Sequence, residues 1–177
     1  MKARTKLMFL LFLLMGAMIT SPAHAIRLQD AYDQAEPGEG YDKRLVLEPN
    51  EVYTGYLVVE PRTSCVIHGH GALIVLDPTG FISAPSQAKL DIDGCVITGG
   101  AFGLNYDWGS NSRVENCTLV ENGMGIRCWG TTVVIKNCII ANNYQYGIAC
   151  LETFEPVILY NNVWGNAQLN YAAYCPG

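Results

Sequence analysis

Six ionisable side chains recur at nearly constant spacing through the middle of the chain, and their types could support catalysis or ion binding. Asp93, Glu115 and Lys136 follow one another at almost equal intervals. Carboxylates and basic side chains can transfer protons, bind divalent cations or neutralise one another. The complete set is His68, Asp91, Asp93, Arg113, Glu115 and Lys136.

In a first hypothesis, three carboxylates bind Ca²⁺, a hard cation that prefers several oxygen ligands. The ligands would be Asp91, Asp93 and Glu115. The ion would neutralise the carboxylate of a uronate sugar. Lys136 or Arg113 would then remove the adjacent proton, so that β-elimination follows. This hypothesis predicts a small calcium-dependent polysaccharide lyase.

A second hypothesis makes Asp93 and Glu115 the acid and the nucleophile of a glycoside hydrolase. If they are neighbours on adjacent strands, their separation of about 5 Å suits a retaining mechanism. The alternative without chemistry is that opposite charges on adjacent strands are ordinary cross-strand pairs on a solvated sheet. Asp91 with Arg113, and Glu115 with Lys136, would be such pairs. From the residues alone, both interpretations stay open.

These side chains can meet only if the chain repeats in space, and its sequence does repeat. Four segments align on a column of small residues at nearly equal intervals, which is Cys95, Cys117, Cys138 and Asn162. We expect two apolar columns to point inward, namely Ile92, Val114, Ile135 and Leu159 before the small residue and Ile97, Leu119, Ile140 and Trp164 after it. A period of about 22 residues, with short β-branched runs and turns of Asn and Gly, predicts a β-solenoid. A leucine-rich repeat shares the period, but the helix that it needs would be interrupted here by Gly and Asn.

The repeat pattern I-x-N-C-x-I-x-x-N-x-x-x-G-I resembles the right-handed parallel β-helix repeat of the pectate lyase superfamily. This resemblance implies an all-β fold, a single-stranded right-handed parallel β-helix of about six coils over residues 26–177. The clearest repeats span residues 89–170, and a short capping helix is implied at residues 28–36. Lyases of this superfamily use acidic Ca²⁺ ligands and a basic residue on the parallel sheet, so the resemblance implies polysaccharide as the partner.

Asparagines and cysteines occupy further columns of the repeat. Asn122, Asn143 and Asn166 are expected to be structural, either in left-handed turns or bonded to the backbone of a neighbouring coil. Among the seven cysteines, Cys128 and Cys150 are matched and could form a disulfide, as could Cys95 with Cys117 or Cys117 with Cys138. The alternative is a reduced ladder of buried thiols. Cys175 is a candidate for an intermolecular bridge.

Aromatic residues near the turns offer a second clue to binding. Exposed rings stack on sugars, and a line of rings at the coil repeat could follow a polysaccharide, whereas rings at turns can also simply cover the core. The candidates for substrate binding are Tyr106, Trp108, Trp129, Tyr144 and Tyr146. His68 and His70 could suggest a metal site, but without a third ligand they fit a Gly-rich bend better.

Residues 1–25 are predicted to be a cleaved leader. A basic start precedes an apolar run at residues 7–19, and a small-residue site ends at Ala25. The run is too short to span a bilayer, so we expect a secreted or periplasmic protein with no membrane segment after cleavage. Three basic residues leave with the leader, so eight basic and 16 acidic residues remain, a formal charge of −8. This charge argues against nucleic acid as a partner.

Together these patterns predict an exported β-helix protein that contacts polysaccharide along its parallel sheet. A calcium-dependent lyase or a glycoside hydrolase is the first alternative. The second is a structural module that associates through coil ends, because an uncapped terminal coil exposes strand edges that can pair with another chain.

Overall fold

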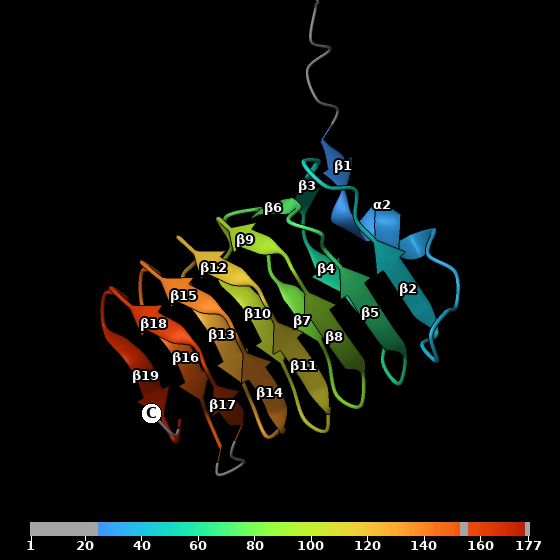
Figure 1. The fold of residues 1–177 in the computed structure, drawn as a ribbon. Coiled ribbons are helices and arrows are strands. Elements are labelled where there is room, and N and C mark those ends of the chain that lie inside the picture. The colour runs from blue at the N-terminus through green and yellow to red at the C-terminus, as the bar shows by residue number, and fades with distance from the viewer. Residues whose placement is uncertain (1–24, 153–155, 176–177) are drawn as a thin grey trace, which may run out of the picture.

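The computed structural model describes residues 25–152 and 156–175, so the predicted leader lies outside the described residues except for Ala25. The chain winds into a solenoid whose coils each contribute one strand to three parallel sheets (Figure 1). The first sheet, here the charged sheet, contains β2 (Lys43–Val46), β5 (Ser64–His68), β8 (Lys89–Asp93), β11 (Ser112–Glu115), β14 (Val133–Lys136) and β17 (Val157–Leu159). This architecture confirms the predicted right-handed parallel β-helix of about six coils.

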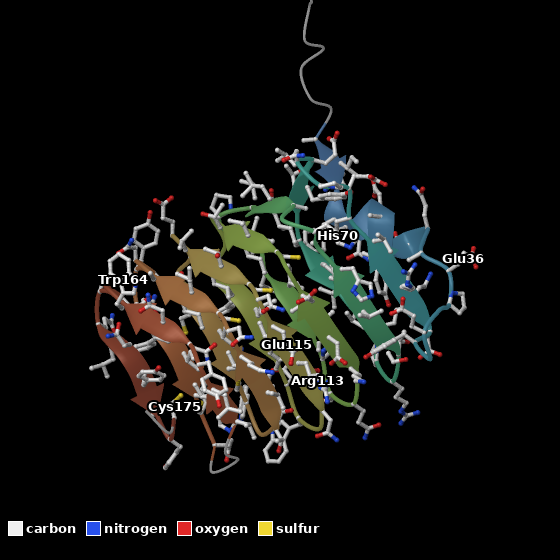
Figure 2. The ribbon with its side chains drawn as sticks, viewed as in Figure 1. Glu36, His70, Arg113, Glu115, Trp164 and Cys175 are labelled. Carbon is white, nitrogen blue, oxygen red and sulfur yellow. The ribbon has the colours of Figure 1, made fainter. Side chains whose placement is uncertain are left out.

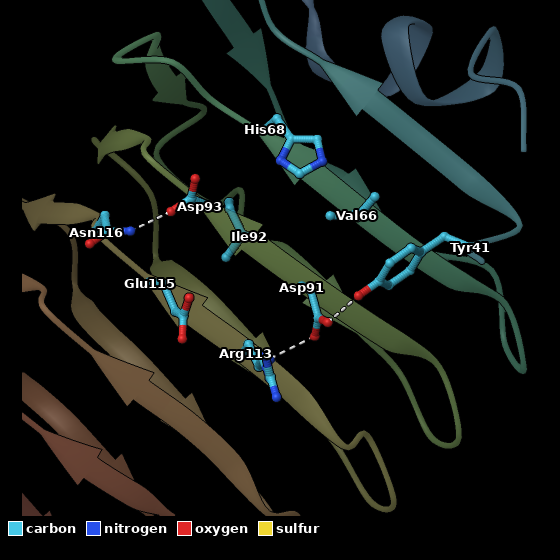
Figure 3. A pocket seen from close by; sticks show the side chains of 9 residues that line it. All are labelled: Tyr41, Val66, His68, Asp91, Ile92, Asp93, Arg113, Glu115 and Asn116. Atoms are coloured by element: carbon cyan, nitrogen blue, oxygen red, sulfur yellow. Dashed lines mark hydrogen bonds between the residues drawn. The ribbon is translucent and has the colours of Figure 1, made fainter. Parts of the chain in front are cut away.

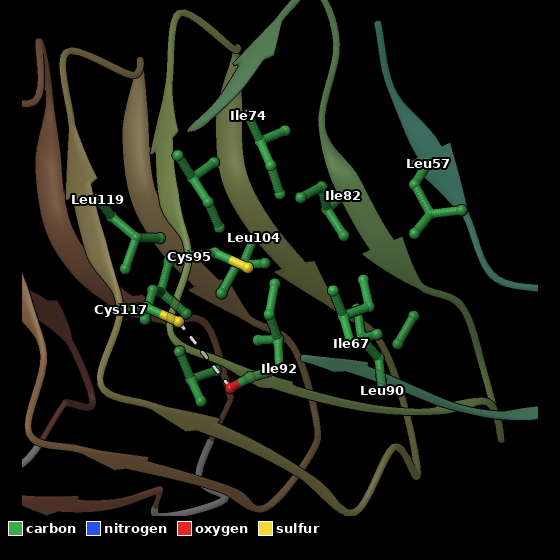
Figure 4. Close-up of a cluster of buried hydrophobic side chains, with 14 of the residues drawn as sticks. Leu57, Ile67, Ile74, Ile82, Leu90, Ile92, Cys95, Leu104, Cys117 and Leu119 are labelled. Carbon is green, nitrogen blue, oxygen red and sulfur yellow. Dashed lines mark hydrogen bonds between the residues drawn. The ribbon is translucent and has the colours of Figure 1, made fainter. Parts of the chain in front are cut away.

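The other two sheets complete each coil. The second sheet contains β1 (Ile26–Arg27), β3 (Val52–Gly55), β6 (Leu73–Leu76), β9 (Val96–Thr98), β12 (Thr118–Val120), β15 (Ile139–Ala141) and β18 (Asn162–Trp164). The third sheet contains β4 (Leu57–Val58), β7 (Ile82–Ala84), β10 (Phe102–Tyr106), β13 (Met124–Cys128), β16 (Tyr146–Cys150) and β19 (Leu169–Ala173). Alternate residues of these short strands point into one continuous apolar core (Figure 4).

A short helix, α2 (Leu28–Asp33), covers the N-terminal end of the solenoid and ends before the predicted boundary at Glu36. Leu28 and Tyr32 are buried, and the Tyr32 hydroxyl accepts the amide of Glu60 just beyond β4. The ammonium of Lys43 donates to the carbonyls of Asp33 and Ala35 at the C-terminal end of the helix. The cap thus satisfies part of a strand edge that would otherwise be free. No helix among the described residues is long and apolar enough to cross a membrane.

The bend between the charged sheet and the second sheet has a left-handed backbone in four successive coils. Gly94, Asn116, Asn137 and Tyr160 occupy this position with φ of 67°, 53°, 54° and 57°. Asn tolerates this conformation better than most residues, which explains Asn116 before Cys117 and Asn137 before Cys138. At Tyr160 a bulky side chain adopts the same conformation.

Buried asparagines join the coils at the bend between the second and third sheets. The Oδ1 of Asn143 accepts the backbone amide of Asn122 at 3.0 Å, and its Nδ2 donates to the carbonyl of Leu119 at 3.2 Å. Asn122 and Asn166 make the same two kinds of contact with their preceding coils. The structural role predicted for these three residues is therefore confirmed.

The register predicted for the last coil is wrong by one residue. Ile135 pairs with Ile158, and Ile140 pairs with Val163, so Asn161 takes the place that was assigned to Asn162. Leu159 and Trp164, which were expected inside, point outward and are 43% and 49% exposed. The inward-facing apolar residues of this coil are only partly buried, and association through this end stays a prediction.

Replacing Asn143 with Ala should destabilise the protein more than any exposed asparagine does. The substitution removes an acceptor and a donor that serve buried backbone groups of the preceding coil. Leaving buried polar groups without partners should lower the free energy of unfolding by about 3 kcal/mol, measured by urea denaturation. Asn111→Ala, at an exposed position, is the control and should change it by less than about 0.5 kcal/mol. Equal losses from the two variants would contradict this role.

Candidate functional site

The predicted row of charged residues lies on the outer face of the charged sheet, in the predicted register. Asp93 pairs with Glu115 and with His68, and Glu115 pairs with Lys136. In the neighbouring row, Asp91 pairs with Arg113. Figure 2 shows Arg113 and Glu115 projecting from this sheet.

Part of this row forms an open depression of about 380 Å³ (Figure 3). It is lined by Tyr41, Val66, His68, Asp91, Ile92, Asp93, Arg113, Glu115 and Asn116. A second depression of about 390 Å³ continues along the same sheet, lined by Lys89, Asn111, Ser112, Arg113, Thr132 and Val134. Arg113 lines both, so the surface can be followed over several coils.

Asp91 anchors one side of the depression. Its Oδ2 accepts a 2.5 Å hydrogen bond from the Tyr41 hydroxyl and lies 3.1 Å from the ammonium of Lys89. Its Oδ1 accepts the backbone amide of Arg113 at 2.8 Å. Only 7% of Asp91 is exposed, so a buried charge is fully engaged by protein donors. The sequence pairs Asp91 with the Arg113 side chain, whereas its ion-pair partner is Lys89.

Tyr41 and Lys89 form a coupled pair beside Asp91. The ammonium lies 3.2 Å from the Tyr41 oxygen and 4.5 Å from the centre of its ring. Burial raises the pKa of the Tyr41 hydroxyl, and its bond to the Asp91 carboxylate raises it further. Partial burial lowers the pKa of the Lys89 ammonium, but contacts with Asp91 and Tyr41 outweigh burial and leave this pKa above its ordinary value.

Asp93 and Glu115 form the opposite, more accessible side. Both are half-buried neighbours on adjacent strands. Asp93 Oδ1 accepts a 2.6 Å hydrogen bond from the side chain of Asn116, which the left-handed turn after β11 directs back over the preceding coil. Two carboxylates at the spacing of adjacent strands thus face one open depression.

The loop after the helix supplies residues that the sequence did not predict for the site. Glu39 contacts the His68 ring at 3.0 Å and Arg44 at 2.8 Å. The bond to His68, and then that to Arg44, lowers the pKa of the Glu39 carboxyl. Tyr41 comes from the same loop, and the signal that could have indicated it is the Gly-rich turn directly before it. The Glu39 carboxylate thus holds His68 in place from outside the repeat.

The two basic residues predicted for catalysis occupy different places. Arg113 is exposed and lines both depressions, whereas Lys136 lies one strand further along and outside the first. Within residues 25–152 and 156–175, no ion pair joins Glu115 to Lys136. The predicted cross-strand ion pair is thus replaced by simple adjacency in the sheet.

The three carboxylates predicted to bind Ca²⁺ do not fit a calcium site. Both oxygens of Asp91 are engaged by Tyr41, Lys89 and the Arg113 amide. Across the part of the chain that the structure describes, no group of three His, Cys, Asp or Glu side chains could hold a metal ion. Calcium prefers several converging oxygens, which Asp93 and Glu115 alone do not supply.

The aromatic residues do not form the expected single line. Tyr106 is wrongly predicted to bind sugar, because it is buried and its hydroxyl points at the carbonyl of Leu90. Trp108 and Trp129 are exposed and follow the C-terminal ends of β10 and β13. Tyr144 and Tyr146 lie at the other end of the third sheet, beside the start of β16. Sugar stacking on these four remaining rings stays a prediction.

All seven cysteines are thiols in this structure. Cys95, Cys117 and Cys138 form the reduced ladder that was one of the two predicted alternatives, and none of their predicted disulfides is present. The predicted partners Cys128 and Cys150 are aligned on adjacent strands but are not bonded.

Comparison with known proteins gives one match. A family model described as a right-handed β-helix region matches residues 62–175. No curated protein and no solved structure matches the chain.

Tyr41→Phe should lower the free energy of unfolding by about 2 kcal/mol, because Asp91 loses its shortest hydrogen bond. Urea denaturation near neutral pH measures this loss. Tyr144→Phe is the matched control, since Tyr144 is 67% exposed, and should change stability by less than about 0.5 kcal/mol. A Tyr41→Phe protein as stable as the wild type would mean that the loop is not fastened through Asp91.

Stability should also fall at high pH through the same cluster. The pKa values of Tyr41 and Lys89 are raised above their ordinary values of 10.0 and 10.5, so the folded protein holds both protons more tightly. Their contribution is complete below about pH 10 and is lost as the pH rises through the folded values. Urea midpoints at about pH 8 and about pH 11 should differ less in Tyr41→Phe than in the wild type. An identical pH dependence in the two proteins would contradict this coupling.

Proposed function

This chain belongs to the right-handed β-helix family, and we propose that it is an exported protein that binds polysaccharide across its charged sheet. The fold is that of pectate lyase-like proteins, but a fold by itself does not define an activity. The observation that carries the proposal is the pair of depressions that meet at Arg113.

The shape and chemistry of this surface suit an extended, hydroxyl-rich polymer. The two depressions follow the strands of successive coils, so a chain lying across them would pass from the carboxylates of the first to the basic and hydroxyl side chains of the second. Carboxylates, an amide, an imidazole and a guanidinium offer both donors and acceptors to hydroxyl groups. Each depression also has an apolar side chain in its lining, Val66 in the first and Val134 in the second.

Arg113 favours an acidic polymer over a neutral one. Its guanidinium has no hydrogen-bond or ion-pair partner among the described residues, and Lys89 lies in the same second depression. A guanidinium can hold a carboxylate through two parallel hydrogen bonds. We therefore place a uronate carboxylate at Arg113 in the proposed complex.

Export is supported by the leader pattern of residues 1–25. A secreted or periplasmic protein would meet polysaccharides directly, and its acidic surface would remain soluble there. Both the compartment and the partner are parts of the proposal.

Cleavage of the bound polymer is the second candidate function. The adjacency of Asp93 and Glu115 at the open side of the depression favours it. Neighbouring strands are about 4.8 Å apart, which is near the carboxylate spacing of retaining glycosidases. In this candidate mechanism Asp93 is the acid and Glu115 the nucleophile, and the side-chain amide of Asn116 fixes the orientation of the Asp93 carboxyl group.

The binding proposal predicts that Arg113→Ala weakens the affinity for a polyuronate about tenfold, through loss of a charge-assisted contact. Isothermal titration with pectin and alginate oligosaccharides, and with a neutral glucan, measures this effect. Arg27→Ala is the control, because Arg27 is an exposed arginine on the second sheet. Unchanged affinity in Arg113→Ala, or no binding of any polysaccharide by the folded wild type, would refute the proposal.

Cleavage is tested on the same polymers. Retaining hydrolysis should produce new reducing ends without the ultraviolet absorbance of an unsaturated uronate, and Glu115→Gln should abolish it while affinity stays within about twofold. Elimination would instead raise that absorbance and depend on Lys136, so that Lys136→Ala would stop cleavage and leave binding nearly intact. If the folded wild type produces neither signal from a polymer that it binds, it is a binding protein only.

A further inference from the structure

Three cysteines lie together at the C-terminal ends of strands of the third sheet. Cys128 and Cys150 are aligned partners on β13 and β16, and both are buried. Cys175 follows β19 and is partly exposed. Cys150 is thus next to Cys128 across the ladder, and the amide of Tyr174, the residue before Cys175, donates to the Cys150 carbonyl. Figure 2 shows Cys175 at this end of the solenoid.

The remaining thiols have a different environment. Cys117 and Cys138 donate to the carbonyls of Glu115 and Lys136 at 3.1 and 3.2 Å, and Cys95 is likewise buried. Burial raises the pKa of the Cys65 thiol to about 12. All four are buried, so a disulfide in solution cannot reach them and they should stay reduced.

The backbone decides which neighbour Cys150 can bond. A disulfide needs Cβ atoms about 3.5–4.5 Å apart, which is closer than the roughly 4.8 Å between adjacent strands. Cys128 and Cys150 both lie inside strands whose hydrogen-bond ladders hold this wider spacing. Cys175 lies beyond the end of β19, held close by the amide of Tyr174, which donates to the Cys150 carbonyl at 3.0 Å. Its backbone can therefore adjust without breaking a ladder.

We propose that Cys150 and Cys175 form a disulfide that fastens β19 to β16 when the protein meets a low-molecular-weight disulfide. This inference rests on the thiol cluster and is independent of the proposed function. The bond would close a loop at the coil whose inward-facing residues are only partly buried. It would therefore stabilise the part of the solenoid with the least core packing.

The exchange balances with oxidised glutathione as the oxidant. The neighbouring Cys150 thiol and partial burial raise the pKa of Cys175, so the exchange begins from the minor fraction of Cys175 that has lost its proton to solvent. This accessible thiolate attacks the glutathione disulfide and forms a mixed disulfide, and the glutathione released takes up a proton. The thiolate of Cys150 then attacks the Cys175 sulfur and expels the second glutathione as a thiol. Cys175 has no S–H once it carries glutathione, but the thiol of Cys128, the largest cause of the lowered pKa of Cys150, still favours the thiolate that this step requires.

Peptide mapping of the purified wild type tests the bond directly. The folded protein is equilibrated with oxidised glutathione, acid-quenched, alkylated and digested, and its cross-linked peptides are identified by mass spectrometry. We expect a Cys150–Cys175 cross-link, with the other five cysteines alkylated. Oxidation should also slow amide hydrogen exchange in β19 by at least about tenfold, relative to the reduced protein.

Two serine variants complete the experiment. Cys128→Ser should keep both the cross-link and the slower exchange, whereas Cys175→Ser should lose both, so that glutathione no longer affects β19. Because the decisive map uses the wild type, a variant that fails to fold does not affect the result. A wild-type map that links Cys150 to Cys128, or that finds Cys150 fully alkylated, would overturn the proposal.

Discussion

Stacking of each coil on the next in fixed register is the constraint on which the whole structure depends. Parallel strands satisfy their backbone only if every coil presents the same groups at the same places, and buried amides enforce this at the bends. The side-chain oxygen of Asn143 accepts the backbone amide of Asn122, and its side-chain nitrogen donates to the carbonyl of Leu119 in the same coil. A shift of one residue would leave these buried groups unpaired. Gly125 adds a steric requirement, because a Cβ there would lie 2.6 Å from the Gly147 carbonyl oxygen of the next coil.

The outer face inherits this register, which is why residues one repeat apart in the sequence become neighbours. Asp93 and Glu115 meet only because the core columns beneath them are aligned. The stacking does not decide which of the resulting pairs interact. Asp91 is engaged by Lys89 and Tyr41, and this leaves Arg113 available on the surface. A charged row on a solenoid is thus divided into a structural anchor and an accessible part, and only the latter can meet a ligand.

The constraint weakens toward the last coil, and the chemistry changes with it. There the inward-facing residues are less buried, and the chain leaves its ladder after β19. Cysteines held within ladders are kept at the strand spacing, whereas a cysteine beyond a ladder can approach its neighbour. The same geometry therefore explains why Cys128 and Cys150 are aligned without being bonded, and why Cys175 is the proposed partner of Cys150.

The repeat pattern alone predicts the solenoid, its inward columns as far as Cys138 and the order of the charged row, because the same local period recurs in each of these coils. It failed at the last coil, where Asn161 and Asn162 both fit the pattern and only strand pairing selects the first. Tyr106 and Leu104 are alternate residues of one strand and both point inward, although the position of Tyr106 next to a turn suggests exposure. The Tyr41 contact with Asp91 joins segments far apart in the sequence, one of them outside the repeat. Such contacts depend on how a non-repeating loop folds back over a sheet, and only the tertiary structure decides that.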